Sequence, residues 1–239
     1  MLPFWIALQF LSSLPVSLPG MPPPQAMGRS LLCYPLVGLL FGVLLWLLHV
    51  VLGATPPLLQ AALLLSAWVL LSGGLHLDGL ADSSDAWLGG FGDRARTLEI
   101  MKDPRSGPIA VVTLMLVLLL KFCALVVLLE RGQVALIVLV PVLGRGALLG
   151  LFLCTPYVRA GGLGQALADH LPRPAGRAVL LIGAIACTLW CGSWMLVVTV
   201  AVFWWLRHLM LRRLGGTTGD TAGALLELIE LAALLALVI

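Results

Sequence analysis

Long apolar stretches separated by short polar ones dominate the chain. The first, 3–14, is short for a bilayer crossing, and we expect it to lie at the interface or to re-enter the membrane. A proline-rich segment at 15–30 is expected to be a loop. The later apolar segments approach the roughly 20 residues that a transmembrane helix needs. They are 31–53, 57–75, 108–129, 133–155, 178–206 and 222–239. The pattern predicts an all-α, polytopic transmembrane bundle with an N-terminal interfacial helix.

The segment 178–206 is too long for one crossing, since a single helix of that length would extend about 43 Å against about 30 Å of hydrocarbon. The basic loop 76–107 is expected in the cytoplasm, and one crossing at 178–206 would then leave the arginines of 207–213 outside. Two short crossings that turn near Gly192 and Ser193 keep them inside. We therefore predict a hairpin, about seven spans, a cytoplasmic N-terminus and an external C-terminus.

Composition supports a membrane protein. Of the 239 residues, 61% are hydrophobic and 10% are charged, whereas a soluble protein carries roughly 25% charged residues. We expect one integral membrane domain over 1–239, with the lipid bilayer as its surroundings. The net charge of +3 is too small and scattered for nucleic-acid binding. The five cysteines form no CxxC pair and are interpreted as small apolar residues.

An acidic cluster follows the apolar segment 57–75. Asp78, Asp82 and Asp85 are spaced i, i+4 and i+7, so a helix would project all three carboxylates from one face. Carboxylates this close repel one another unless a cation lies between them, and oxygen ligands suit Mg²⁺. His76 is a candidate proton carrier or phosphate contact, or else an interfacial histidine. The cluster predicts a Mg²⁺ site at a membrane edge and phosphate chemistry on a membrane-associated substrate.

A glycine-rich turn precedes the last apolar segment and contains Gly215, Gly216, Thr218, Gly219 and Asp220. Glycines followed by a helix N-terminus are suited to holding a phosphate. Asp220 would either cap that helix or act on the phosphate through a metal. The turn is therefore a candidate phosphate-binding element.

Four charged residues lie inside apolar segments, where charge is costly and marks a functional site by default. Glu227 and Glu230 continue the helical face of Asp220 and would hold a second metal, order its ligands, or be protonated and hydrogen-bonded. Lys121 and Arg145 would either pair with these glutamates or contact a phosphate, which the planar guanidinium of arginine matches well.

The predicted topology places the polar motifs on the cytoplasmic side. These are the acidic cluster, the loop 156–177 and the turn 215–220, and we expect them to converge on one cytoplasm-facing site. The segment 93–105 is interpreted as an amphipathic cytoplasmic helix that contacts anionic lipid.

The two acidic motifs together resemble cobalamin synthase, also called adenosylcobinamide-GDP ribazoletransferase. The resemblance runs from about residue 4 to the C-terminus. Its main carriers are 74–82 with Asp85, and 215–221 with Glu227. Further matches are Tyr34-Pro35-Leu36-Val37-Gly38, Glu99-Ile100-Met101 with Asp103 and Arg105, Arg145-Gly146, and Gly162-Leu163-Gly164. One departure is Ser12-Ser13, where the family usually has Thr-Arg.

The resemblance implies the last assembly steps of vitamin B12. The family joins adenosylcobinamide-GDP to α-ribazole or its 5′-phosphate and releases GMP, using Mg²⁺ in the bacterial cytoplasmic membrane. Asp78, Asp82 and Asp85 would then bind one or two Mg²⁺ ions that bridge the diphosphate, and Asp220 and Glu227 would complete the metal shell.

The remaining roles follow from the same interpretation. Arg145 or Arg105 would stabilise the leaving phosphate, and His76 or a carboxylate would be the general base. Self-association into a homo-oligomer is left open.

Two other classes remain as alternatives. A CDP-alcohol phosphotransferase also uses clustered aspartates at a membrane edge, but 78–82 lacks its Ala-Arg pair and no aspartate lies four residues after Asp85. A cation transporter would use the intramembrane charges as an ion pathway, yet transporters often contain inverted repeats, and none is visible in this sequence.

Overall fold

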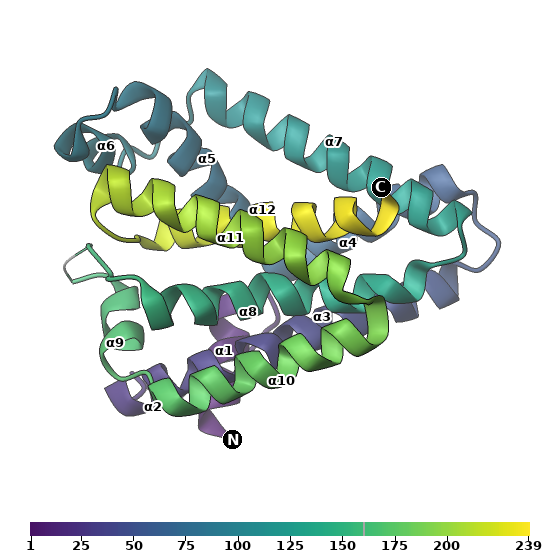
Figure 1. The fold of residues 1–239 in the computed structure, drawn as a ribbon, viewed down its shortest axis with the longest axis horizontal. Coiled ribbons are helices and arrows are strands. Elements are labelled where there is room, and N and C mark those ends of the chain that lie inside the picture. Colours follow the sequence, from purple (N-terminus) through teal and green to yellow (C-terminus); the bar gives the residue numbers. More distant parts are fainter. Residues whose placement is uncertain (160) are drawn as a thin grey trace.

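The chain folds into a bundle of helices in a computed structural model that describes residues 1–159 and 161–239 (Figure 1). The longer helices are α3 (Tyr34–Leu52), α4 (Pro57–Ser72), α5 (Leu75–Gly89), α7 (Pro108–Glu130), α8 (Leu139–Cys154), α10 (Arg173–Cys191), α11 (Ser193–Leu214) and α12 (Gly219–Val238). The shorter ones are α1 (Leu2–Leu11), α2 (Pro24–Ser30), η1 (Leu31–Cys33), α6 (Arg94–Ile100), η2 (Val134–Val138) and α9 (Leu163–Asp169).

Within the described residues, six helices are long and apolar enough to cross a membrane, and a seventh crossing results if α4 and α5 count as one bent span. Together with the short apolar helix α1, this confirms the predicted polytopic bundle. The prediction of a loop over 15–30 is wrong for its second half, because α2 runs through η1 into α3 and Pro24–Leu52 forms one candidate span. Pro24 stands at the first position of α2, where a missing N–H costs nothing.

The hairpin predicted within 178–206 is confirmed. Helix α10 ends at Cys191 and α11 begins at Ser193, so a single residue separates them. That residue, Gly192, has a φ of +78°, a conformation that glycine adopts without steric cost. The two helices meet there and diverge toward their other ends (Figure 1).

A sharp bend separates α4 from α5. The two helix axes differ by 87°, and Gly73 and Gly74 between them have φ values of +63° and +71°. Because of this bend α5 packs against α7 and α12. The segment 76–107, which was expected to connect two spans and to contain helices at 78–85 and 93–105, contains most of α5 and all of α6.

Helix α12 lies at the centre of the bundle, where it packs against α5, α7, α8 and α11 (Figure 1). By contrast, α4, α7, α10 and α11 expose many large apolar side chains, as expected for helices that face lipid. The central position of α12 brings its first residues against α5.

Candidate functional site

The acidic cluster lies on one helix, as predicted. Asp78, Asp82 and Asp85 all belong to α5; Asp78 is exposed and the other two are half-buried. The charges that act on Asp82 are those of Asp78, Asp220, Asp85 and Arg159. The structure therefore brings the α5 carboxylates together with Asp220 of α12.

Two glycines allow α5 and α12 to cross closely. A Cβ atom on Gly79 would lie against the backbone of Asp220, and one on Gly223 would lie 3.2 Å from the backbone of His76. Larger residues at these positions would hold the two helices apart. This crossing confirms that the glycine-rich turn meets the acidic cluster.

The 156–159 segment completes the site. The N–H of Val158 donates to the carbonyl of Thr217 at 2.9 Å, and the N–H of Thr217 donates to the carbonyl of Pro156 at the same distance. This pairing places the guanidinium of Arg159 3.1 Å from the Asp220 carboxylate. In the sequence, Arg159 is one of several basic residues of the loop 156–177, which we expected in the cytoplasm.

Thr218, and not Asp220, caps α12. The Thr218 hydroxyl accepts the N–H of Thr221 at 3.2 Å, and the Thr221 hydroxyl accepts the N–H of Thr218 at 2.9 Å, which forms a capping box. Asp220 is thereby left for another role. Of the four predicted phosphate-binding residues of this turn, Gly215 and Gly219 are exposed, whereas Gly216 and Thr218 are buried; their contact with a phosphate stays a prediction.

Asp85 has a structural task. Its carboxylate accepts the backbone N–H groups of Gly107 and of Ala110, the latter at 3.0 Å, at the start of α7. A carboxylate at this position satisfies free amides and complements the helix dipole. Asp85 therefore ties α5 to α7.

The intramembrane charges form a separate buried cluster, consisting of Lys121, Arg145, Glu227 and Glu230. The ammonium of Lys121 lies 2.6 Å from Glu227 and 2.8 Å from Glu230, and Arg145 pairs with Glu230. The ion-pair alternative of the sequence analysis is thus what the structure contains. Glu227 lies two helical turns, about 10 Å, along α12 from Asp220. A phosphate contact of Lys121 or Arg145 stays a prediction.

His76, at the start of α5, lies near this buried cluster. It is buried, its Nδ1 atom has no hydrogen-bond partner within the described residues, and the charges that act on it are those of Arg145 and Lys121. Its role as a general base stays a prediction.

Arg105 lies on the surface. Its side chain is 86% exposed and pairs with Asp103. Hydrogen bonds from Arg105 lower the pKa of the Asp103 carboxyl to about 2. The partner of Arg105 in the structure is therefore Asp103. A contact between Arg105 and a leaving phosphate stays a prediction.

Tyr157 is a site residue that the sequence did not reveal. Its ring lies against the backbone of Gly164 and stacks on Phe152, with the ring centroids 6.2 Å apart. Burial raises the pKa of the Tyr157 phenol, and the nearby charge of Arg159 partly opposes that rise. The phenol is therefore protonated at neutral pH. Its only signal in the sequence was the glycine pair at 162 and 164.

As the side chains stand in the described part of the chain, no group of three or more His, Cys, Asp or Glu residues is placed to hold a metal ion. The five predicted ligands accordingly lie in two places, with Glu227 apart from the others. The oxygen donors of Asp78, Asp82 and Asp220 nevertheless suit Mg²⁺ chemically, since Mg²⁺ commonly uses one or two carboxylates and takes its other ligands from water and substrate phosphates. Mg²⁺ binding stays a prediction.

Comparison with known proteins gives a consistent result over the full chain. A family model described as cobalamin-5-phosphate synthase matches residues 3–238. An adenosylcobinamide-GDP ribazoletransferase of Pseudomonas fluorescens is 74% identical over 238 residues, which cover 98% of each chain. One of Pseudomonas putida is 73% identical over 237 residues, covering 99% of this chain and 98% of the relative. One of Pseudomonas syringae pv. syringae is 70% identical over 240 residues, covering 99% of each. No solved structure matches.

Proposed function

Because the chain belongs to the cobalamin-5-phosphate synthase family, we propose that its acidic centre, formed by α5, the 156–159 segment and the start of α12, carries out the adenosylcobinamide-GDP ribazoletransferase reaction. The protein transfers the cobinamide-phosphate moiety of adenosylcobinamide-GDP to α-ribazole or its 5′-phosphate. GMP is released, and the product is adenosylcobalamin or its 5′-phosphate, late in vitamin B12 synthesis. The family match favours this reaction over the CDP-alcohol phosphotransferase and cation-transporter alternatives.

One observation supports this assignment most strongly. Three segments far apart in the sequence bring Asp82, Asp220 and Arg159 to one place. Displacement at phosphorus depends mainly on holding the attacking and leaving oxygens in line and on neutralising charge. The carboxylates of this site can hold a cation, and the guanidinium can bind a phosphate directly, so the site can neutralise the charge of the diphosphate in both ways.

Asp78, Asp82 and Asp220 would hold Mg²⁺, which supplies neutralisation of the diphosphate charge when bound. Asp85 would support the site by fixing α5 against α7. Glu227 would support the structure through its ion pair with Lys121.

Arg159 is the cation that we assign to the departing GMP phosphate. Its side chain is 39% exposed and already lies at the centre, whereas Arg145 is fully buried against Glu230 and Arg105 pairs with Asp103 on the surface. A guanidinium offers paired donors that match phosphate oxygens.

We place this site on the cytoplasmic face of the bacterial cytoplasmic membrane. The basic segments 94–105, 156–177 and 207–213 support this orientation through the positive-inside rule. Figure 1 shows α6, α9 and the end of α11 at the same end of the bundle as the start of α12.

The test is GMP release from adenosylcobinamide-GDP by purified protein in lipid nanodiscs, given α-ribazole 5′-phosphate and Mg²⁺. The native protein is expected to release GMP, and Asp82→Asn is expected to release none while keeping the native melting temperature. Asp169→Asn, on the exposed end of α9, is the matched control and should remain active. An active Asp82→Asn protein would refute the assigned site. If the native protein released no GMP but conducted cations, the transporter alternative would replace the proposal.

A further inference from the structure

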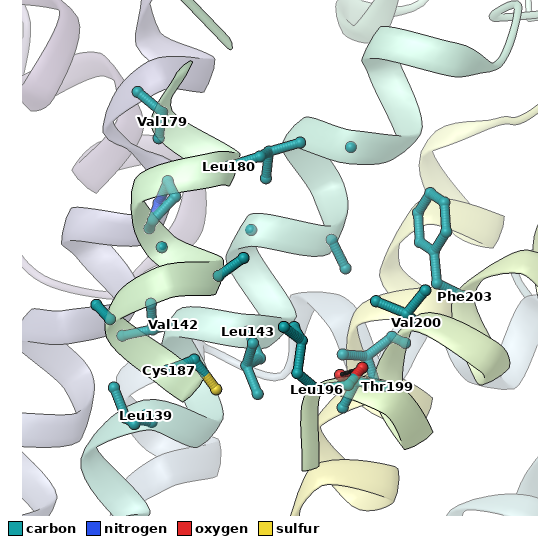
Figure 2. A pocket seen from close by; sticks show the side chains of 18 of the residues that line it. Leu139, Val142, Leu143, Val179, Leu180, Cys187, Leu196, Thr199, Val200 and Phe203 are labelled. Carbon is teal, nitrogen blue, oxygen red and sulfur yellow. Dashed lines mark hydrogen bonds between the residues drawn. The ribbon is translucent and has the colours of Figure 1, made fainter. Parts of the chain in front are cut away.

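An apolar groove lies between α8, α10 and α11, away from the acidic centre. Its volume is about 310 Å³, at the lower end of the range of ligand pockets. Figure 2 shows the lining side chains of the three helices gathered around the gap, among them Leu143 of α8, Leu180 of α10 and Phe203 of α11. The groove is lined by residues of both α10 and α11, the two helices that diverge from their hairpin (Figure 1).

The lining accepts hydrocarbon. Thr199 supplies the one hydroxyl among the described lining residues, and it donates to the carbonyls of Met195 and Leu196 in its own helix, at 2.9 and 3.0 Å. The groove thus offers a ligand almost no hydrogen-bonding group. Because α10 and α11 are candidate membrane spans with exposed apolar faces, we expect lipid around the groove.

Positively charged side chains lie at the end of the groove that is farthest from the α10–α11 hairpin. Arg177 lies one turn before Leu180 on α10, and Arg207 lies one turn after Trp204 on α11. Arg207 donates to the Cys154 carbonyl and to the Thr155 hydroxyl, and its guanidinium lies 5.1 Å from the Trp204 ring centroid. These contacts fix the charge beside a residue that lines the groove.

Nothing on the flanking helices offsets this charge. The sequences of α8, α10 and α11 contain no acidic residue. Arg173, at the start of α10, adds a third cation and donates to the Leu153 carbonyl at 2.8 Å. A ligand that suits this place combines an apolar tail with an anionic head. Basic pockets between membrane helices on the cytoplasmic side bind anionic lipid head groups.

We propose that an anionic phospholipid binds between α8, α10 and α11, with one acyl chain in the groove and its phosphate at Arg177 and Arg207. The lipid fills the gap under the α10–α11 hairpin and so holds that hairpin against α8. This inference does not rest on the proposed reaction, because it concerns binding and stability.

The experiment compares phosphatidylglycerol with phosphatidylcholine of the same acyl chains, each added to detergent-purified full-length protein. Phosphatidylglycerol is expected to remain bound in native mass spectra and to raise the melting temperature by about 5 °C at saturation. Equal retention and equal stabilisation by the two lipids would overturn the proposal.

Gly183 provides a variant that fills the groove. It lines the groove, and a Cβ atom built on it meets no atom within 4 Å, so Gly183→Leu places bulk there without a backbone clash. This variant is expected to lose both the lipid adduct and the temperature shift. Ile182→Phe adds bulk at the neighbouring exposed position and should retain both. An unchanged shift in Gly183→Leu would place the lipid elsewhere and refute the assignment.

The head-group contact is tested separately. Arg177→Gln should bind the two lipids about equally, while Arg131→Gln, at the turn after α7, removes the same charge and should keep the preference for phosphatidylglycerol. A preference that survives Arg177→Gln unchanged would contradict the head-group assignment. A protein dimer that disappears in Gly183→Leu, without any lipid adduct, would show that a second copy covers the groove and would overturn the proposal.

Discussion

Gly79 of α5 lies directly against the backbone of Asp220 at the start of α12. A Cβ atom added to Gly79 would come within 2.7 Å of the Asp220 carbonyl oxygen. Backbone at this distance cannot give way as a flexible side chain would. The absence of a side chain at Gly79 therefore sets how closely the carboxylates of Asp78 and Asp82 approach Asp220.

Gly79→Ala is expected to separate α5 from α12 and to lower both stability and turnover. Overpacking of this kind typically costs about 1–3 kcal/mol. A loss of stability in Gly79→Ala would point to the close helix crossing, because alanine in a helix interior is otherwise favoured over glycine by about 0.5–1 kcal/mol. Thermal unfolding and GMP release measure the two effects. Gly183→Ala, measured in detergent without added phospholipid, is the control, since its methyl group then meets open space, and it should lose neither stability nor turnover. Full activity of Gly79→Ala would show that the crossing tolerates separation.

Asp85 permits a test that separates a helix cap from a metal ligand. Asp85→Asn keeps one acceptor oxygen for the amides of Gly107 and Ala110 but loses the charge that favours the α7 N-terminus. We expect a loss of about 1 kcal/mol in the free energy of unfolding. The Mg²⁺ concentration for half-maximal rate should stay unchanged. A raised Mg²⁺ requirement at unchanged stability would instead identify Asp85 as a ligand.

Lys121 pairs with two buried carboxylates, and its replacement should lower the stability of the protein strongly. Lys121→Met leaves Glu227 without its partner, and breaking a buried ion pair typically costs about 3–5 kcal/mol. Lys121→Met combined with Glu227→Gln removes both charges and should recover much of the melting temperature. Lys102→Met changes an exposed lysine of the same charge and should have little effect. If Lys121→Met melted like Lys102→Met, the buried cluster would carry little of the stability.

Local pattern was enough to predict several features. The spacing of Asp78, Asp82 and Asp85 fixes a common helical face whatever surrounds the helix, and length and charge placed the hairpin near Gly192. These signals depend on neighbouring residues and on the bilayer thickness. The bend at Gly73 and Gly74 was missed because the apolar run continues through both glycines, so that hydropathy gave no sign of a break.

Contacts between distant segments could not be predicted from such local patterns. Arg159 and Asp220 are separated by 61 positions, and Asp85 reaches amides 22 and 25 positions ahead. Each contact depends on how whole helices pack, which periodicity does not specify. The sequence indicated that the charges within the spans need partners, but it left open whether those partners were one another or a phosphate.

Arg159 should matter for the reaction more than for the fold. Its pair with Asp220 is partly exposed, and such pairs contribute little to stability, about 0–1 kcal/mol. Arg159→Gln is therefore expected to melt like the native protein while GMP release falls by about a hundredfold or more, as for the loss of a charge that stabilises the transition state. Arg173→Gln, at the first residue of α10, is the control. If Arg159→Gln released GMP at the native rate, the assignment of the phosphate contact to Arg159 would be wrong, and another cation would have to make that contact.

Removal of divalent cations tests which carboxylates belong to the metal site. A chelator should abolish GMP release, and added Mg²⁺ should restore it, because the diphosphate charge needs neutralisation before it can be displaced. Asp78→Asn removes an oxygen donor from the acidic centre and should raise the Mg²⁺ concentration for half-maximal rate by about tenfold or more. Glu227→Gln should leave that concentration unchanged, since Glu227 pairs with Lys121 in the buried cluster. Its effect should appear in the melting temperature instead. If Glu227→Gln raised the Mg²⁺ requirement as strongly as Asp78→Asn, the metal site would extend down α12, and the ion pair with Lys121 would have to open during turnover.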